Sequence, residues 1–182
     1  MSKKKLLVVL LSVATMFGAS AQKFKPSPVF LKGEKEINVI FDYSQAKYGK
    51  DAQSKYYKEK GKKWVEEWEG KRRENNATTF IKDINEELKG KATVGVYPEA
   101  QYTLVVTVLN CYFGVYPMTP GRLECTVKLV KTGTTAMLAS TTVKVAQNSY
   151  TLVGTPVDFD RMYMAFGELG EQLGEKLYKI LK

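Results

Sequence analysis

The chain has 182 residues, of which 28 are basic and 19 acidic, so its formal net charge is +9 at neutral pH. It contains no histidine, which removes the most frequent general base and metal ligand and excludes Ser-His and Cys-His catalytic pairs. The sequence also has no glycine-rich phosphate loop and no cluster with metal-ligand spacing. Composition and motifs therefore disfavour an enzyme of these classes, and no cofactor is predicted.

Residues 1–21 have the pattern of a secretory signal peptide. Lysines at positions 3–5 precede a short apolar run over residues 6–18, and small residues end the segment at Ala21, where we expect cleavage. The run is shorter than the roughly 20 apolar residues of a membrane-spanning helix. No cysteine stands at the cleavage site to carry a lipid anchor. We therefore expect an exported chain in the bacterial periplasm or at the cell exterior, with the outer membrane as a candidate location.

Cleavage after Ala21 removes three lysines and no acid, which lowers the formal charge from +9 to about +6. An exported protein rarely meets nucleic acid, so anionic glycans and lipid headgroups are the candidate partners for this charge. The simpler interpretation is a basic, well-solvated surface.

Residues 22–36 contain two prolines and a glycine and predict an extended N-terminal arm ahead of a single domain at 37–182. Apolar side chains alternate over residues 37–43, which predicts the first strand. Residues 45–61 are rich in lysine and tyrosine with poor periodicity, so they predict a loop or a frayed helix start.

Residues 62–88 predict a helical region in which two apolar stripes are out of phase. The earlier stripe contains Trp64 and Trp68. Either the helix breaks near Gly70 or at Asn75-Asn76, or the tryptophans face something other than the sheet. Tryptophans one turn apart are more often core than a binding platform, but the phase mismatch makes them interface candidates.

Three alternating runs within residues 102–145 predict antiparallel strands, preceded by a short strand at 92–97. Turn residues at 117–121 and 132–134 separate the runs. Pairing the first two strands about Met118 sets apolar residues opposite each other, namely Phe113 with Leu123, Cys111 with Cys125 and Leu109 with Val127. Folding the next hairpin about Gly133 sets Met137 beside Leu129 and Ala139 beside Val127.

This register places Cys111 opposite Cys125 in a compartment that permits disulfides. Directly opposed cysteines on neighbouring strands form strained bridges, so a disulfide and a pair of buried thiols both remain open. In either form their role is structural.

The strand at 102–113 is apolar on both faces, which is typical of a strand covered on both sides. One face carries Val105, Leu109, Cys111 and Phe113, and the other carries Tyr102, Leu104, Val106, Val108 and Tyr112. The second cover is either the arm at 23–35 or part of the helical region, or it is another chain. In the last case the candidate interface consists of Leu104, Val106, Val108, Trp64 and Trp68.

A C-terminal helix is predicted to begin with Thr155 as its N-cap and Pro156 in its first turn. Its apolar stripe is one-faced and comprises Phe159, Met162, Phe166, Leu169, Leu173, Leu177, Ile180 and Leu181. Gly170 and Gly174 flank this stripe, which predicts close packing of the helix on the sheet.

The order of strand, helix, antiparallel strands and final helix resembles small envelope domains such as the lipopolysaccharide-assembly lipoprotein LptE and the N-terminal domains of TolB and the curli secretion protein CsgG. The likeness is one of architecture and rests on the segments INVIFDYS (37–44), FIKDINEEL (80–88), YTLVVTVLN (102–110) and FGELGEQLGEKLYKIL (166–181). It implies a bacterial envelope role by analogy.

We therefore predict an α+β fold, a two-layer sandwich in which two helices pack on one face of a mostly antiparallel sheet of four or five strands. The leading hypothesis is a non-catalytic envelope protein that contacts another protein or itself. The alternative is a glycan- or lipid-binding module that uses Tyr102, Tyr112, Tyr116 and the tryptophans as stacking surfaces. A glycosidase could use two carboxylates such as Asp42 and Glu124, but no pattern singles them out.

Overall fold

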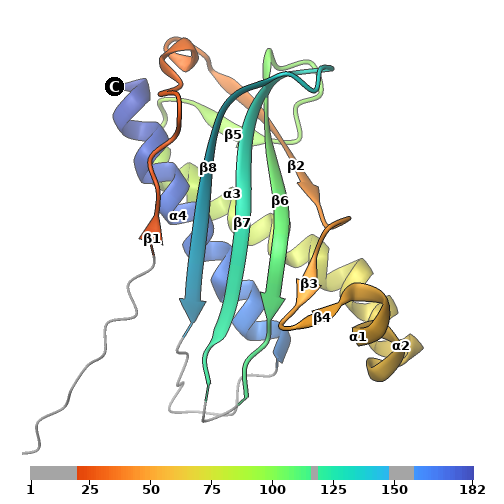
Figure 1. Cartoon of the computed structure of the whole chain (residues 1–182). Coiled ribbons are helices and arrows are strands. Elements are labelled where there is room, and N and C mark those ends of the chain that lie inside the picture. The colour runs from red at the N-terminus through yellow and green to blue at the C-terminus, as the bar shows by residue number, and fades with distance from the viewer. Residues whose placement is uncertain (1–19, 116–118, 148–157) are drawn as a thin grey trace, which may run out of the picture.

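Three long antiparallel strands form the centre of a sheet in the computed structural model, which describes residues 20–115, 119–147 and 158–182 (Figure 1). These strands are β6 (Tyr102–Tyr112), β7 (Gly121–Lys131) and β8 (Met137–Gln147). Most of the expected signal peptide, Tyr116 and the expected helix cap at Thr155 and Pro156 lie outside the described residues.

Shorter strands extend the sheet on both sides, in the order β1-β8-β7-β6-β2-β5. β2 (Glu36–Asp42) runs parallel to β6, and β5 (Thr93–Gly95) runs parallel to β2. β1 (Ser20–Ala21) pairs with β8, and the two-residue strands β3 (Lys47–Tyr48) and β4 (Asp51–Ala52) form a hairpin beside β6. Within the described residues the sheet thus has eight strands, more than predicted, because two-residue strands leave no periodic signal.

Two long helices, α3 (Arg73–Leu88) and α4 (Asp158–Leu181), cover one face of the sheet, as Figure 1 shows. The predicted α+β fold with two helices on one face is confirmed. The arm at 22–36 contains a single 3-10 turn, Val29–Leu31, and runs beside β8.

The helical region at 62–88 is broken, as one of the alternatives predicted. α1 (Gln53–Lys60) and α2 (Lys62–Glu67) precede a π-helical turn, Trp68–Arg72, which leads into α3. Within that turn Gly70 has φ −88° and ψ −111°, outside the helical region. The break lets the tryptophans and the later stripe both face inward despite their different phases.

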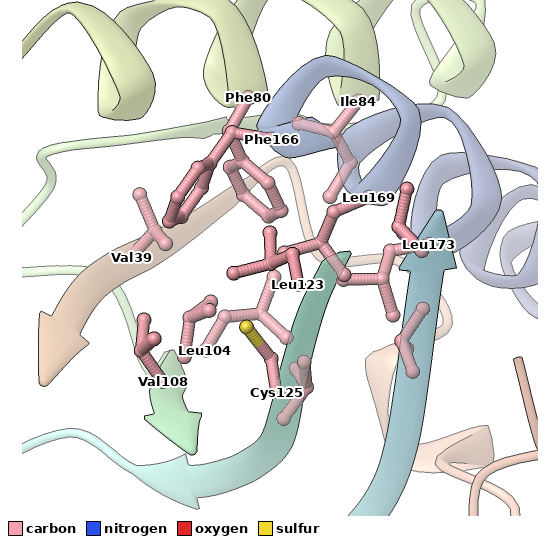
Figure 2. Close-up of a cluster of buried hydrophobic side chains, with 14 of the residues drawn as sticks. Val39, Phe80, Ile84, Leu104, Val108, Leu123, Cys125, Phe166, Leu169 and Leu173 are labelled. Carbon is pink, nitrogen blue, oxygen red and sulfur yellow. The ribbon is translucent and has the colours of Figure 1, made fainter. Parts of the chain in front are cut away.

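The core lies between the helices and β2, β6, β7 and β8. Figure 2 shows sheet residues Val39, Leu104, Val108, Leu123 and Cys125 lying against helix residues Phe80, Ile84, Phe166, Leu169 and Leu173. The predicted stripe of α4 is confirmed, since Met162, Phe166, Leu169, Leu173 and Leu177 are fully buried.

The predicted register of the first hairpin is wrong for two reasons: Val115 pairs with Thr119, one residue off a pairing about Met118, and β6 contains a bulge. Val108 pairs with Cys125 and Asn110 with Glu124, so Leu109 is skipped. One extra residue reverses which face the following side chains point to. Leu104, Val106 and Val108 therefore share the buried face with Cys111 and Phe113, which follow the bulge.

The individual pairs differ accordingly from those predicted. Cys111 lies opposite Leu123, and Val106 lies opposite Val127. Val115 pairs with Thr119, so the two strands are shifted relative to a pairing about Met118. In the second hairpin Leu129 pairs with Ala139 and Val127 with Thr141. Met137, expected beside Leu129, instead pairs with Val130 and is exposed.

The glycines of α4 face α3 and not the sheet, which corrects the sequence prediction. A Cβ on Gly170 would lie 2.6 Å from the carbonyl oxygen of Phe80, and one on Gly174 would lie 2.7 Å from that of Ile84. Close packing does explain these glycines, but the contact is between the two helices.

Candidate functional site

An open cleft of about 920 Å³ lies where the β3–β4 hairpin, α1 and the ends of β6, β7 and β8 meet. Its volume is in the range of small-molecule binding sites. Aromatic rings on its walls come from Tyr48, Tyr56, Tyr112 and Phe113. Of these four, only Tyr112 is predicted from the sequence as a ligand-stacking residue.

The β3–β4 turn forms one wall and is held against β6 by a side-chain amide. Asn110 donates from Nδ2 to the Gly49 carbonyl oxygen at 3.0 Å and accepts from the Gly49 N–H at 3.1 Å. Gly49 has φ +66°, a left-handed conformation, and a Cβ there would lie 3.2 Å from the Tyr112 ring. Glycine at this position thus allows the turn to approach Tyr112.

Tyr112 is half-buried, and its hydroxyl shares a hydrogen bond of 3.0 Å with the Thr119 hydroxyl. The same hydroxyl group of Thr119 accepts from the Val115 N–H at 2.9 Å. These bonds fix the ring in the cleft wall. By contrast, Tyr102 lies at the other end of β6, roughly 33 Å away along the strand, where its ring packs on Phe30 with centroids 4.9 Å apart. Tyr102 is therefore not part of the cleft.

Basic side chains outnumber acids in the cleft. Lys50, Lys60, Arg122 and Lys144 line it together with Asp51 and Glu124, four cations against two carboxylates. The Lys144 ammonium lies 2.9 Å from the Glu124 carboxylate. Lys60 lies over the ring of Tyr56, with 5.4 Å between its Nζ and the ring centroid. A local excess of positive charge beside aromatic faces suits an anionic ligand with apolar surfaces.

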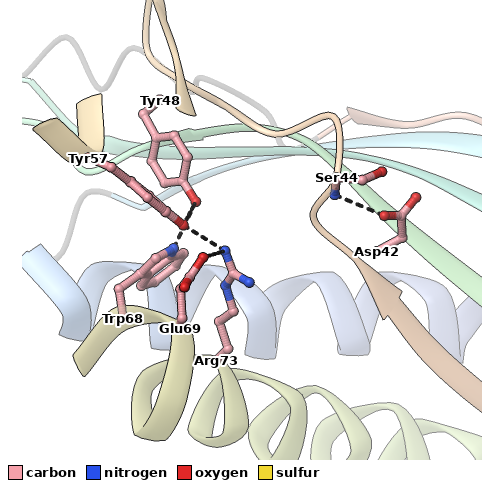
Figure 3. Close-up of polar contacts among 7 residues, drawn as sticks. All are labelled: Asp42, Ser44, Tyr48, Tyr57, Trp68, Glu69 and Arg73. Atoms are coloured by element: carbon pink, nitrogen blue, oxygen red, sulfur yellow. Dashed lines mark hydrogen bonds and ion pairs between the residues drawn. The ribbon is translucent and has the colours of Figure 1, made fainter. Parts of the chain in front are cut away.

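A partly buried polar network supports the cleft from behind (Figure 3). The indole of Trp68 donates to the Tyr48 hydroxyl at 2.8 Å, and that hydroxyl shares a 3.0 Å bond with the Tyr57 hydroxyl. Arg73 donates to the Tyr57 hydroxyl at 2.7 Å. Burial raises the pKa of Tyr48 and, more strongly, that of Tyr43. The network fixes Tyr48, whose ring lines the cleft.

The prediction that Trp64 and Trp68 form an exposed platform is not supported by their placement. Trp68 is fully buried, and Trp64 is half-buried among other rings. Its ring centroid lies 5.5 Å from that of Phe113 and 5.4 Å from that of Phe159. The tryptophans are part of the core behind the cleft.

The rest of the predicted interface is also core. Leu104, Val106 and Val108 have no exposed surface and lie beneath the helices. The bulge at Leu109 places them on the same face of β6 as Cys111 and Phe113. The cover of this face is the helix layer of the same chain. On the helix-free face Val105 and Leu109 are half-buried, and Ile40 is 49% exposed.

Cys111 and Cys125 are free thiols in the buried core, and their predicted opposition across the hairpin is wrong. Burial raises the pKa of Cys111 to about 12 and also raises that of Cys125. A thiol whose pKa is raised in this way is a poor nucleophile. The structure therefore contains the second of the two alternatives, a pair of buried thiols.

The two carboxylates considered for glycoside hydrolysis have separate partners. Asp42 accepts a 2.9 Å bond from the Ser44 N–H, shown in Figure 3, which lowers the pKa of Asp42. Glu124 pairs with Lys144. A general acid needs a raised pKa, so Asp42 is not suited to that role.

Most cleft residues were missed from the sequence, namely Tyr48, Lys50, Tyr56, Lys60, Asn110, Arg122 and Lys144. The available signal was the richness of residues 45–61 in lysine and tyrosine, which supplies four of these seven. It could not be connected with Arg122 and Lys144, because they lie on strands distant in sequence.

Fold and cleft together define a two-layer α+β domain with an open, aromatic and basic cleft. Within the described residues, no helix has the length and apolar character to cross a bilayer. No protein-family model matches the chain, and no curated protein matches its sequence.

Two solved structures resemble the fold at low sequence identity. One is the PelC dodecamer from Paraburkholderia phytofirmans, with 12% identity, a TM-score of 0.45, and 86% of this chain and 96% of that chain covered. The other is a DUF330 protein from Xanthomonas campestris, with 13% identity, a TM-score of 0.39, and coverage of 79% and 81%. At these values neither neighbour assigns a function or an assembly to this chain. The resemblance to LptE, TolB and CsgG domains stays a prediction.

Proposed function

We propose that this chain is an exported, non-catalytic cell-envelope protein whose cleft binds an acidic glycan. The observation that carries the proposal is the combination of tyrosine rings with Lys50, Lys60, Arg122 and Lys144 around one open cleft. Sugar rings present apolar faces that pack on aromatic side chains, and uronic acid carboxylates pair with lysine and arginine. The expected positive charge of the mature chain supports the same partner class.

The distribution of the cations favours a polymer over a single lipid headgroup. Lys50 follows β3, Lys60 ends α1, Arg122 is the second residue of β7 and Lys144 lies near the end of β8, so the charges surround the cleft from four elements. A headgroup phosphate places its charge at one point, where a cluster of cations would converge on it. Repeated carboxylates along a glycan match separated cations.

Calorimetry on residues 22–182 tests the proposal with an oligogalacturonate, a neutral glucan of equal length, and vesicles containing anionic phosphatidylglycerol. We expect binding to the oligogalacturonate alone, weakening as salt is raised. Arg122→Gln should weaken it several-fold. Lys128→Gln is the matched control, because Lys128 is exposed on the same strand but outside the cleft.

Three results would contradict the proposal: equal binding of the neutral glucan, binding to the vesicles alone, or equal effects of the two charge-removing variants. The first would make the cations irrelevant, the second would identify a lipid ligand, and the third would indicate attraction to the whole basic surface.

A role in protein contact is the second candidate, and the helix-free face of the sheet favours it. Ile40 is 49% exposed there and pairs in register with Val105 of β6. Size measurement in solution with Ile40→Lys tests this role. A monomer that the substitution leaves unchanged would count against self-association through this face.

A further inference from the structure

The bond at which we expect the leader to be removed lies inside the sheet. Ser20 and Ala21 pair with β8, opposite Lys144 and Val143 respectively. The amide nitrogen of the Ala21–Gln22 bond belongs to Gln22, and it donates to the Thr142 carbonyl oxygen at 3.2 Å. Backbone on both sides of this bond is thus part of the antiparallel ladder.

The residues that follow the bond are anchored as well. The carbonyl oxygen of Gln22 accepts from the Thr141 hydroxyl and from the Lys176 ammonium of α4. Lys25 exchanges two backbone hydrogen bonds with Ser140, at 2.8 and 3.0 Å. Phe24, between them, is only 6% exposed and belongs to the core cluster. Figure 1 shows this segment running beside β8 and α4.

We infer that folding hides the Ala21–Gln22 bond, so that the leader must be removed before the arm docks on β8. A peptidase binds its substrate as an extended strand within its own cleft, so several residues on both sides of the bond must be free of the rest of the protein. A segment paired with β8 meets this need only after it detaches from that strand. Detachment also removes the side chain of Phe24 from the core. The inference rests on the expected cleavage after Ala21 and is independent of the cleft and its ligand.

The cleavage itself leaves the mature segment able to dock. Hydrolysis adds one water across the bond, which leaves a carboxylate on Ala21 and an ammonium on Gln22. The new ammonium retains N–H groups that can donate to the Thr142 carbonyl oxygen. The contacts of Phe24 and Lys25 do not involve the departing leader.

The test uses the full chain, folded in detergent micelles, and a bacterial signal peptidase. Cleavage of the folded chain is compared with cleavage of the same chain diluted from urea directly into the reaction, and mass spectrometry locates the cut. We expect the unfolded chain to be cut after Ala21, and the folded chain about tenfold or more slowly, because detachment must precede each cut.

Two alanine variants distinguish detachment of the arm from a nonspecific effect of mutation on the cleavage rate. Phe24→Ala removes the buried anchor and should speed cleavage of the folded chain. Val29→Ala is the matched control in the same arm, because Val29 is 61% exposed, and it should change nothing. Equal rates for folded and unfolded chains, a cut at another bond, no cut in the unfolded chain, or no effect of Phe24→Ala would each overturn the inference.

Discussion

Asn110 binds the backbone of Gly49 through both ends of its side-chain amide, with distances of 3.0 and 3.1 Å, as a neighbouring strand would. A second asparagine has the same arrangement elsewhere. Asn85 of α3 donates to the Val94 carbonyl oxygen at 2.8 Å and accepts from the Val94 N–H at 2.7 Å. The Asn110 bonds hold a wall of the cleft, and the Asn85 bonds cover the outer edge of β5.

These two asparagines, Asn110 and Asn85, provide a matched pair of substitutions. Asn110→Ala and Asn85→Ala should each lower the free energy of unfolding by about 1–3 kcal/mol, because each removes two hydrogen bonds to a part-buried stretch of backbone. Asn110→Ala should cost less of the two, since the Gly49 N–H keeps its 3.2 Å bond to the Cys111 carbonyl oxygen. Only Asn110→Ala should also weaken glycan binding, since it frees the β3–β4 turn. Urea unfolding and calorimetry measure the two effects. Equal affinities for the two variants would show that the turn does not shape the site.

Gly170 of α4 should not tolerate alanine. Alanine gains about 1 kcal/mol in helix propensity, but its Cβ would lie 2.6 Å from the Phe80 carbonyl oxygen, and separating the helices costs about 1–3 kcal/mol. We therefore expect a net loss of stability in urea unfolding. At Gly167 the corresponding contact is the end of the Asp83 side chain, which can move, so Gly167→Ala should cost less. A stabilised Gly170→Ala would contradict the close helix packing.

Stability should fall in alkaline solution. The pKa of Cys111 is raised by burial from an ordinary value of 9.0 to about 12. The unfolded chain therefore releases this proton at a lower pH than the folded chain. Stabilisation is complete below pH 9 and decreases above it by up to about 1.4 kcal/mol per pH unit for each such group. Cys125 acts in the same direction, and Tyr43 and Tyr48 add to the loss above pH 10.

Urea unfolding at pH 8, 9 and 10 measures this dependence. A chain with Cys111→Ala and Cys125→Ala should be less stable at pH 8, because it has two cavities, but should lose less stability between pH 9 and 10. An unchanged slope would show that the thiols are not the groups responsible.

The thiols should also remain reduced. Their strands pair Cys111 with Leu123 and Cys125 with Val108, so neither lies directly opposite the other. Mass spectrometry after alkylation in denaturant, without reductant, should find two modified cysteines per chain. An unmodified chain two mass units lighter than the reduced form would contradict the register of β6 and β7.

The α4 helix and the strands could be predicted because their apolar side chains repeat with a clear period. Met162, Phe166 and Leu169 keep one face of the helix, and Val127 and Leu129 keep one face of β7. The register could not be predicted, because residues 102–113 are apolar at both odd and even positions, so the sequence indicates neither the bulge at Leu109 nor the pairing of Val115 with Thr119. Alternation alone does not show where a strand gains an extra residue.

The cleft was harder to predict than the fold. Its wall depends on two-residue strands and on the side chain of Asn110, which no hydrophobic pattern indicates. Its cations come from segments that only the fold brings together, such as Lys50 and Arg122. Tyr112, predicted as a ligand-stacking residue, lies in the cleft wall, whereas Tyr102, predicted in the same way, lies at the other end of β6.

An NMR titration of ¹⁵N-labelled residues 22–182 with an oligogalacturonate tests the proposed function most directly. Binding in the cleft should shift the amide signals of Gly49, Asn110, Tyr112 and Thr119, and leave Val94 at the far edge of the sheet unchanged. Signals that do not move, or shifts spread evenly over the basic surface, would contradict a glycan site in this cleft.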